Sequence, residues 1–210
     1  SGPDAQKLIE TTAVDAVSLT GSTEAGEQVA ATAGAHIKKC VLELGGSDPF
    51  IILADADLDA ACKAALQARM QNTGQSCIAA KRFIVERGAV QKFEEIMLRL
   101  FDTLIMGNPL DEKTTIGPLA KAEGAQGLKK QVDASLQQGA RILKGGKISV
   151  GKGFFFEPTL LTNISAEMPV WKDEVFGPVM SYMPVDSADQ AIAMANKSEY
   201  GLGASIWTCD

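Results

Sequence analysis

The sequence predicts an α/β fold, because strand-like and helix-like segments alternate along its length. Residues 13–21 are rich in apolar and β-branched side chains and end in a glycine, and residues 22–35 follow with a helical pattern. Residues 40–46 form a second strand-like segment that closes with paired glycines. A strand, a helix and a strand in this order form the unit found in nucleotide-binding parallel sheets.

The same alternation continues through the rest of the chain. The expected elements are, in order, a strand at 48–55, helices at 57–66, 90–104 and 121–138, strands at 140–146, 153–161 and 177–185, a helix at 187–198 and a strand at 203–209. Asp57 is the expected N-cap of the first of these helices, and Gly139 is expected to end the third. Ser187 and Gln190 have the spacing of a capping box.

The paired glycines give the best boundary between two domains, 1–45 and 46–210. On this interpretation the first segment is one strand–helix–strand unit and the second is a larger α/β domain. Ser1 is not an initiator methionine, and the last expected strand reaches almost to the end of the sequence. We therefore expect the chain to be a piece of a longer protein.

The composition of the chain argues against several classes of protein. With 46% hydrophobic and 22% charged residues, the chain has the make-up of a globular protein. A net charge of -6, with basic residues only in scattered pairs, argues against a nucleic-acid partner. Acidic residues interrupt the apolar run at 50–61, which argues against a membrane span. Without a recognisable signal sequence, the expected location is the cytoplasm.

The cysteines and the single histidine argue against a metal site. Cysteines at 40, 62, 77 and 209 lack the spacing of metal ligands, and His36 is the only histidine. A low cysteine content without paired spacings suits a reducing compartment better than a disulfide scaffold. We therefore expect no bound metal.

Cys77 lies in a setting unlike that of a core cysteine. Cys40 and Cys62 lie in apolar runs and are expected to act as small packing residues. Cys77 instead follows Gly74 and Ser76, at an expected loop tip or helix start where a thiol is accessible and reactive. A nucleophilic and a structural role are both open for it.

Two further candidate sites lie near the ends of the first two expected strands. Gly21, Ser22 and the amides of the following helix start suit a phosphate group, and Ser22 is equally suited to cap that helix. The two roles are compatible. Glu43 lies inside an otherwise apolar strand, just before the paired glycines, where a carboxylate loses hydration and becomes a stronger general base. A Glu paired with a lysine on a solvated strand face is the alternative.

A last candidate site lies in residues 171–179. Glu174 and Phe176 are two apart, so in an extended segment they face the same side. A carboxylate and a ring there can hold a ribose and a flat heterocycle. The alternative is a hydrophobic hairpin with a surface Glu. The basic pair Lys81 and Arg82 is expected to face solvent, so no residue is assigned to a substrate carboxylate.

Four motifs in order give the chain a family resemblance. They are GSTEAG at 21–26, LELGG at 42–46, NTGQSC at 72–77 and DEVFGPV at 173–179. With these motifs the chain resembles the NAD(P)-dependent aldehyde dehydrogenase superfamily over nearly all of 12–210. The resemblance implies a three-layer αβα catalytic domain at 46–210, truncated at its C-terminal end. It makes 1–45 the last part of a Rossmann-like cofactor domain.

The resemblance also implies roles for the candidate residues. Cys77 becomes the nucleophile that forms a thiohemiacetal and then a thioester, and Glu43 becomes the general base that activates water. The implied contacts to NAD or NADP come from Gly21, Ser22, Gly26, Leu44, Glu174 and Phe176. The implied partners of the parent protein are a small-molecule aldehyde and further copies of itself in a homo-oligomer.

The implied substrate comes from a narrower resemblance. Residues 38–59 and 72–86 are most similar to the bacterial succinate-semialdehyde dehydrogenase branch, which implies oxidation of succinate semialdehyde to succinate. The first half that family members have is missing here, and so is a segment after the last strand. We therefore expect the 210 residues alone to have little dehydrogenase activity.

Three alternatives stay open. A CoA-acylating relative passes the thioester to CoA rather than to water, but such relatives tend to lack a carboxylate at the position of Glu43. A non-catalytic scaffold with the same fold is not expected to retain both Cys77 and Glu43. A cysteine hydrolase needs a histidine, and only His36 is available for that role.

Overall fold

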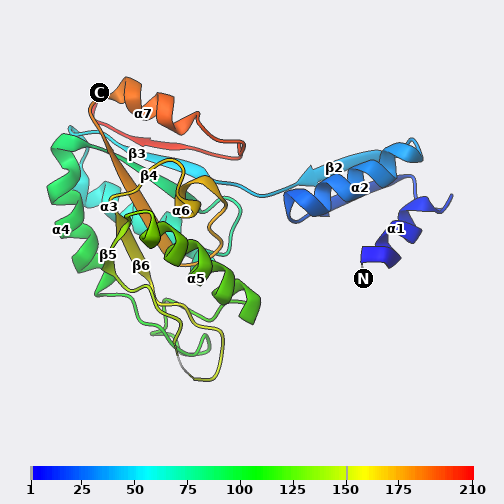
Figure 1. Cartoon of the computed structure of the whole chain (residues 1–210), viewed down its shortest axis with the longest axis horizontal. Helices are drawn as coiled ribbons and strands as arrows, with labels where there is room; N and C mark the ends of the chain where they lie inside the picture. Colours follow the sequence, from blue (N-terminus) through cyan, green and yellow to red (C-terminus); the bar gives the residue numbers. More distant parts are fainter. Residues whose placement is uncertain (1, 150) are drawn as a thin grey trace. The chain divides into compact units, whose positions relative to one another are not determined.

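The computed structural model of the chain describes residues 2–149 and 151–210 and divides into two compact units (Figure 1). The smaller unit ends at Gly45 and the larger one begins at Gly46. The elements of the smaller unit are α1 (Gly2–Glu10), β1 (Ala16–Thr20), α2 (Thr23–Ala35) and β2 (Lys39–Glu43).

The smaller unit contains the predicted strand–helix–strand motif. Strands β1 and β2 are parallel, with a register that runs from Ala16 opposite Lys39 to Thr20 opposite Glu43. Helix α2 connects them, as a parallel pair requires. Helix α1, which the sequence pattern did not predict, precedes β1. The Lys38 ammonium donates hydrogen bonds to the carbonyl of Ile9 within α1 and to that of Thr11 just after it.

The larger unit is built on one six-stranded sheet. Its elements are β3 (Asp48–Ile52), α3 (Leu58–Met70), η1 (Gln71–Gly74), β4 (Ala80–Glu86), η2 (Arg87–Ala89), α4 (Val90–Phe101), α5 (Ala122–Gln137), β5 (Arg141–Lys144), β6 (Thr159–Thr162), α6 (Pro169–Lys172), β7 (Val179–Val185), α7 (Ala188–Ala195) and β8 (Ser205–Trp207). The strand order is β5-β6-β7-β4-β3-β8, and every neighbouring pair except β5 with β6 is parallel.

Helices cover both faces of this sheet, which gives the predicted three-layer αβα arrangement. Alternate residues of a strand point to opposite faces. Phe83 and Val85 of β4 therefore pack in one core with α3 and α4. Ile84 packs in the other core, where α5, α6 and α7 contribute Val132, Trp171 and Ala191 among others.

Most of the predicted helix boundaries agree with the structure. The Asp57 side chain accepts a hydrogen bond from the Ala60 amide at 3.1 Å and caps α3. Ser187 caps α7 in the same way, through the Gln190 amide at 3.2 Å. Gly139 follows α5 with φ of +105°, a conformation that glycine adopts readily.

Two strands differ from the sequence-based prediction. The strand expected at 153–161 is reduced to β6, because Phe154 and Phe156 pair only in isolated bridges with Leu119 and Ile148. Strand β4 lies in the middle of the sheet but was not predicted, because its second and third residues are the basic pair Lys81 and Arg82. None of the helices in the described part of the chain has the length and apolar character needed to cross a membrane.

Candidate active site

Three loops of the larger unit meet at the amino-terminal ends of strands β3, β4 and β7. Gly46 and Ser47 precede β3, residues 76–79 precede β4, and residues 174–178 precede β7. These three strands are parallel neighbours, so the loops that enter them lie side by side. The topology therefore brings together Cys77 and Glu174, which are far apart in the sequence.

Cys77 lies in a turn that leads directly into β4. The Ala79 amide donates to the Ser76 carbonyl at 3.2 Å and closes this turn, residues 76–79, which we call the Cys77 turn. The thiol is free and partly buried, and the next side chain, Ile78, is 60% exposed. Cys62, by contrast, is fully buried in the core as predicted, and Cys40 is partly buried.

The segment before the Cys77 turn has an unusual backbone. Asn72, Thr73 and Gly74 all have positive φ, at 50°, 57° and 74°. This region is uncommon for residues other than glycine, and a β-branched Thr there is an outlier. Side chains hold the conformation: Thr73 Oγ1 accepts from the Gly117 amide at 3.0 Å, and the Asn72 side chain donates to the Gln75 carbonyl at 2.9 Å.

Two glycines let the three loops pack backbone against backbone. A Cβ atom on Gly74 would lie 2.2 Å from the carbonyl oxygen of Gly177 in the loop before β7. A Cβ atom on Gly46 would lie 2.3 Å from the carbonyl oxygen of Cys77. Only glycine fits at such close approaches. The segment that contains Gly74 and the Cys77 turn is therefore held between the loop before β3 and the loop before β7.

The basic pair at the start of β4 is buried, which corrects the expectation that it faces solvent. Lys81 is 1% exposed and Arg82 is 2% exposed. The two side chains lie on opposite faces of β4 and both reach backbone carbonyls. Lys81 donates to the carbonyls of the Cys77 turn, and Arg82 donates to Ser47 and to Met194 and Ala195 at the end of α7.

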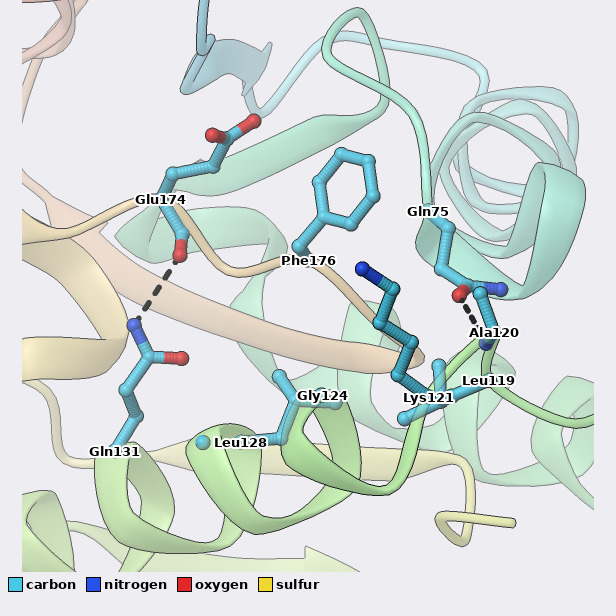
Figure 2. Close-up of a pocket in the computed structure, with 10 residues that line it drawn as sticks. Gln75, Leu119, Ala120, Lys121, Gly124, Leu128, Gln131, Glu174 and Phe176 are labelled. Carbon is cyan, nitrogen blue, oxygen red and sulfur yellow. Dashed lines mark hydrogen bonds between the residues drawn. The ribbon is translucent and has the colours of Figure 1, made fainter. Parts of the chain in front are cut away.

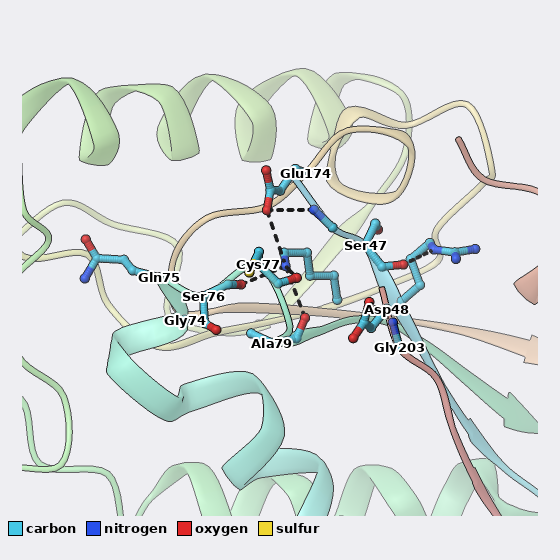
Figure 3. A network of polar contacts seen from close by, with 12 residues as sticks. Ser47, Asp48, Gly74, Gln75, Ser76, Cys77, Ala79, Glu174 and Gly203 are labelled. Atoms are coloured by element: carbon cyan, nitrogen blue, oxygen red, sulfur yellow. Dashed lines mark hydrogen bonds and ion pairs between the residues drawn. The ribbon is translucent and has the colours of Figure 1, made fainter. Parts of the chain in front are cut away.

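Glu174 belongs to the same polar network as the Cys77 turn (Figure 3). Its Oε1 accepts from the Gly46 amide at 3.2 Å and lies 3.6 Å from the Lys81 ammonium. Its side chain is 22% exposed, so the alternative of a solvated surface Glu is wrong. Burial lowers the pKa of Lys81 to about 8, aided by repulsion from Arg69, while Glu174 and Asp48 oppose the change.

A cavity of about 540 Å³ opens beside Glu174 (Figure 2). Both Glu174 and Phe176 line it, as their spacing predicted, and the Phe176 side chain is 46% exposed. The other lining residues are Gln75, Leu119, Ala120, Lys121, Gly124, Gly127, Leu128 and Gln131.

The α5 side of this cavity was missed in the sequence. Gly124 and Gly127 lie inside α5, although glycine destabilises a helix interior. Two glycines three residues apart leave one face of the helix without side chains, and this pattern could have indicated that α5 lines a cavity. Gln75 ties the Cys77 segment to the opposite edge, because its Oε1 accepts from the Ala120 amide at 2.9 Å. Lys121 extends from the start of α5 toward Phe176 (Figure 2).

In the smaller unit, the candidate residues lie at the carboxyl ends of β1 and β2 and at the start of α2. Strands β1 and β2 are parallel, and the Gly21 amide after β1 donates to the Glu43 carbonyl at the end of β2, at 3.0 Å. Ser22 caps α2 through the Ala25 amide at 3.2 Å, as one interpretation predicted. A Cβ atom on Gly26 would lie only 2.5 Å from the Leu44 side chain, so α2 approaches Leu44 closely here.

Glu43 and His36 are both exposed to solvent. The Glu43 side chain is exposed, since β2 alternates between exposed and partly buried residues, so the expected loss of hydration is wrong. His36 is exposed, and its Nδ1 hydrogen-bonds the Thr32 carbonyl within its own helix, at 3.0 Å. Over residues 2–149 and 151–210, no group of three or more His, Cys, Asp or Glu is arranged to hold a metal ion.

The larger unit has three layers around a mostly parallel sheet and carries a free, partly buried cysteine in a turn, and a strand–helix–strand unit precedes it in the sequence. The family model for the aldehyde dehydrogenase family matches residues 3–210, and the chain belongs to that family.

The chain is similar to several named aldehyde dehydrogenases. The chain is 48% identical to the succinate semialdehyde dehydrogenase [NAD(P)+] Sad of Escherichia coli K12, over 97% of the chain and 44% of that protein. It is 46% identical to a succinate-semialdehyde dehydrogenase [NADP(+)] of Mycobacterium avium, over 98% of the chain and 43% of that protein. The solved structure of Escherichia coli lactaldehyde dehydrogenase matches with a TM-score of 0.95 at 39% identity, over 98% of the chain and 43% of that structure. The chain thus spans less than half the length of these relatives.

Proposed function

We propose that the full-length protein oxidises an aldehyde to a carboxylic acid and reduces NAD(P)+, with Cys77 as the nucleophile. The observation that carries this proposal is the position of Cys77. Its free thiol lies on a turn that packs against Gly46. The turn follows Gln75, which lines a cavity together with a carboxylate and an exposed ring. A thiolate so placed can attack a carbonyl carbon and form a thiohemiacetal.

The backbone of Cys77 supports the first step. Attack on the carbonyl places a negative charge on its oxygen, and this charge needs hydrogen-bond donors. No acceptor in the described part of the chain takes a hydrogen bond from the Cys77 amide. That amide is therefore available to the oxyanion, which is the former carbonyl oxygen on the carbon that the Cys77 sulfur has attacked.

Each unit, taken by itself, offers features that suit part of a dinucleotide. A volume of about 540 Å³ is within the range of roughly 300–1,000 Å³ that small-molecule pockets occupy. Phe176 offers a ring face for the nicotinamide, and Glu174 offers a carboxylate for the ribose beside it. Gly21, Ser22 and Gly26 suit the diphosphate at the start of α2, which would make the smaller unit part of a cofactor domain. When bound, NAD(P)+ would supply the hydride acceptor for this reaction.

Glu43 is the proposed base for the second half of the reaction. Loss of the hydride leaves the acyl group on Cys77 as a thioester. A base removes a proton from water, the water oxygen bonds to the acyl carbon, and the carbon–sulfur bond breaks to restore the thiolate. The Glu43 carboxylate is exposed and can therefore reach water.

We propose succinate semialdehyde as the substrate. The support is the similarity to the two succinate-semialdehyde dehydrogenases, whose names also carry NAD(P)+ and NADP(+) as cofactors. Arg82 is not proposed as the group that binds the substrate carboxylate, since its guanidinium already donates to three carbonyls.

The full-length protein tests these roles directly. Purified protein is mixed with succinate semialdehyde, a panel of other aldehydes and either NAD+ or NADP+, and formation of NAD(P)H is followed at 340 nm. Cys77→Ala is expected to abolish turnover. The matched control is Cys209→Ala, which removes an exposed thiol at the other end of the sheet and should leave turnover unchanged.

Glu43→Gln tests the base. Here we expect a burst of about one NAD(P)H per active site, followed by slow release of acid from an acyl-enzyme that mass spectrometry detects on Cys77. A strict requirement for CoA in the wild-type protein would instead support an acylating enzyme. Full turnover by Cys77→Ala would end the proposal.

A further inference from the structure

Three carbonyl groups of the Cys77 turn point at one buried ammonium group. Lys81 Nζ donates to the carbonyls of Ser76 and Cys77 at 2.9 Å each and of Ala79 at 3.2 Å. An ammonium group has three N–H donors, so the turn uses all of them. With only 1% of Lys81 exposed, water does not compete for these bonds. The inner side of the Cys77 turn is thereby fixed.

The orientation of the carbonyls determines where the amides point. In a trans peptide the C=O of one residue and the N–H of the next point in opposite directions, and no described peptide bond is cis. Because the Ser76 and Cys77 carbonyls face Lys81, the amides of Cys77 and Ile78 face away from it. In the described part of the chain neither amide has an acceptor. Two successive free amides form the kind of concave donor group that binds anions.

A second buried cation extends this arrangement along the loop. Arg69, at the end of α3, is 0% exposed, and its Nη2 donates to the Gly74 carbonyl at 2.7 Å. The inner carbonyls of residues 74, 76, 77 and 79 therefore all accept from buried cations. Glu174 lies against the same cluster and, through the Gly46 amide, connects it to the loop before β3. Figure 3 shows Ser76, Cys77, Ala79 and Glu174 in this network.

We infer that Lys81 is a positioning residue for the reaction: by holding the carbonyls of the Cys77 turn inward, it aims the Cys77 and Ile78 amides at the oxyanion formed on Cys77. This inference rests on the proposed aldehyde dehydrogenase function. Lys81 itself touches neither substrate nor cofactor. It acts only through the backbone that carries the nucleophile.

Loss of the ammonium should therefore affect the transition state more than the binding of cofactor. Met has a similar length and no donor, so Lys81→Met leaves three buried carbonyls without partners. The turn must then reorient toward water or other donors, and the Cys77 amide leaves the oxyanion. Removal of one oxyanion donor typically lowers kcat by about 10²–10³-fold. We expect a fall in kcat of at least about 10²-fold, with KM for NAD(P)+ changed less than about threefold.

Arg82→Met is the matched control. Arg82 is adjacent in sequence, is equally buried and also donates to three carbonyls, but those belong to Ser47 and the end of α7. A general effect of removing a buried cation should appear in both variants. Reorientation of the Cys77 turn should appear only in Lys81→Met.

The experiment measures two quantities on the full-length wild-type, Lys81→Met and Arg82→Met proteins. Steady-state kinetics give kcat and KM for NAD(P)+. Hydrogen–deuterium exchange with mass spectrometry follows a peptide that contains residues 75–80, at equal fractions of folded protein. We expect faster exchange in this peptide, together with the loss of kcat, only in Lys81→Met.

The outcomes separate the inference from the proposed function. Turnover by Lys81→Met within about twofold of wild type would overturn the inference while leaving the dehydrogenase assignment intact. So would an equal loss of kcat in Arg82→Met, since that indicates a general loss of packing. If the wild-type protein oxidises no aldehyde, the proposed function fails. In that case unchanged exchange in Lys81→Met would show separately that Lys81 does not hold the turn.

Discussion

The contact between Gly46 and the Cys77 turn gives the sharpest prediction about this site. Gly46 is buried, and a Cβ atom there would lie 2.3 Å from the Cys77 carbonyl oxygen and 2.9 Å from the Leu202 side chain. The φ of Gly46 is outside the left-handed region, so alanine can adopt its backbone conformation. Gly46→Ala therefore adds one methyl group and perturbs only the packing of two loops.

The size of the effect follows from the distances. Ordinary contact begins near 3.4 Å, so the Cys77 carbonyl must move by about 1 Å, whereas the Leu202 side chain can rotate away. This movement stretches the 2.9 Å hydrogen bond from Lys81 beyond a useful length. Overpacking of this kind costs about 1–3 kcal/mol of stability. A displacement of 1 Å at a nucleophile lowers the rate by about 10²-fold.

Two assays measure these quantities. Both tryptophans of the chain, Trp171 and Trp207, lie in the larger unit, so urea unfolding followed by their fluorescence reports the stability of that unit. The kcat of the full-length protein reports the position of the thiol. Gly201→Ala is the control, because a Cβ atom there meets nothing within 4 Å.

The expected pattern is a loss of both stability and kcat in Gly46→Ala and of neither in Gly201→Ala. If Gly46→Ala unfolded within about 0.5 kcal/mol of wild type and kept its kcat, the two loops would not be in contact. The account of how the Cys77 turn is held in place would then be refuted.

Three further predictions concern the buried cation, a buried phenol and the smaller unit. Burial lowers the pKa of Lys81 from 10.5 to about 8, so the unfolded chain binds more protons than the folded chain between these pH values. The free energy of unfolding of wild type, relative to that of Lys81→Met, should therefore rise from about pH 8 to 10.5 in urea titrations. A difference that does not change with pH would contradict this. Tyr182→Phe removes the buried hydroxyl that donates to Glu94, and should lower the free energy of unfolding by about 1–3 kcal/mol; no change would show that the pair contributes nothing. Gly26→Ala should leave thermal stability nearly unchanged, because the gain from alanine in the helix offsets the cost of shifting the Leu44 side chain. The same substitution should raise KM for NAD(P)+ in the full-length protein. An unchanged KM would show that the position of Leu44 does not affect cofactor binding.

Much of the architecture follows from local sequence. The alternation of strand and helix patterns predicts the α/β class, because periods of two and of about three and a half residues reflect which side chains can face a core. The caps at Asp57 and Ser187 are local too, since each needs only an amide three residues ahead. Cys77 was selected by its polar neighbours, and the structure places it in a turn.

The surroundings of charged side chains could not be predicted in this way. In the sequence, Lys81 and Arg82 are a basic pair of the kind that usually faces water, and this hid the central strand β4. Glu43 had the opposite outcome: its apolar neighbours suggested burial, yet its side chain is exposed at the end of β2.

The sequence by itself thus determined the class of fold, most element boundaries and the candidate nucleophile. Only the tertiary structure decided that Lys81 is buried and that Glu174 lies beside it. The physical reason is that a charge leaves water only where partners replace it. The partners of Lys81 are carbonyls of the turn before β4 and a carboxylate from the loop before β7. These segments meet only when parallel strands bring their starting ends to one edge of the sheet.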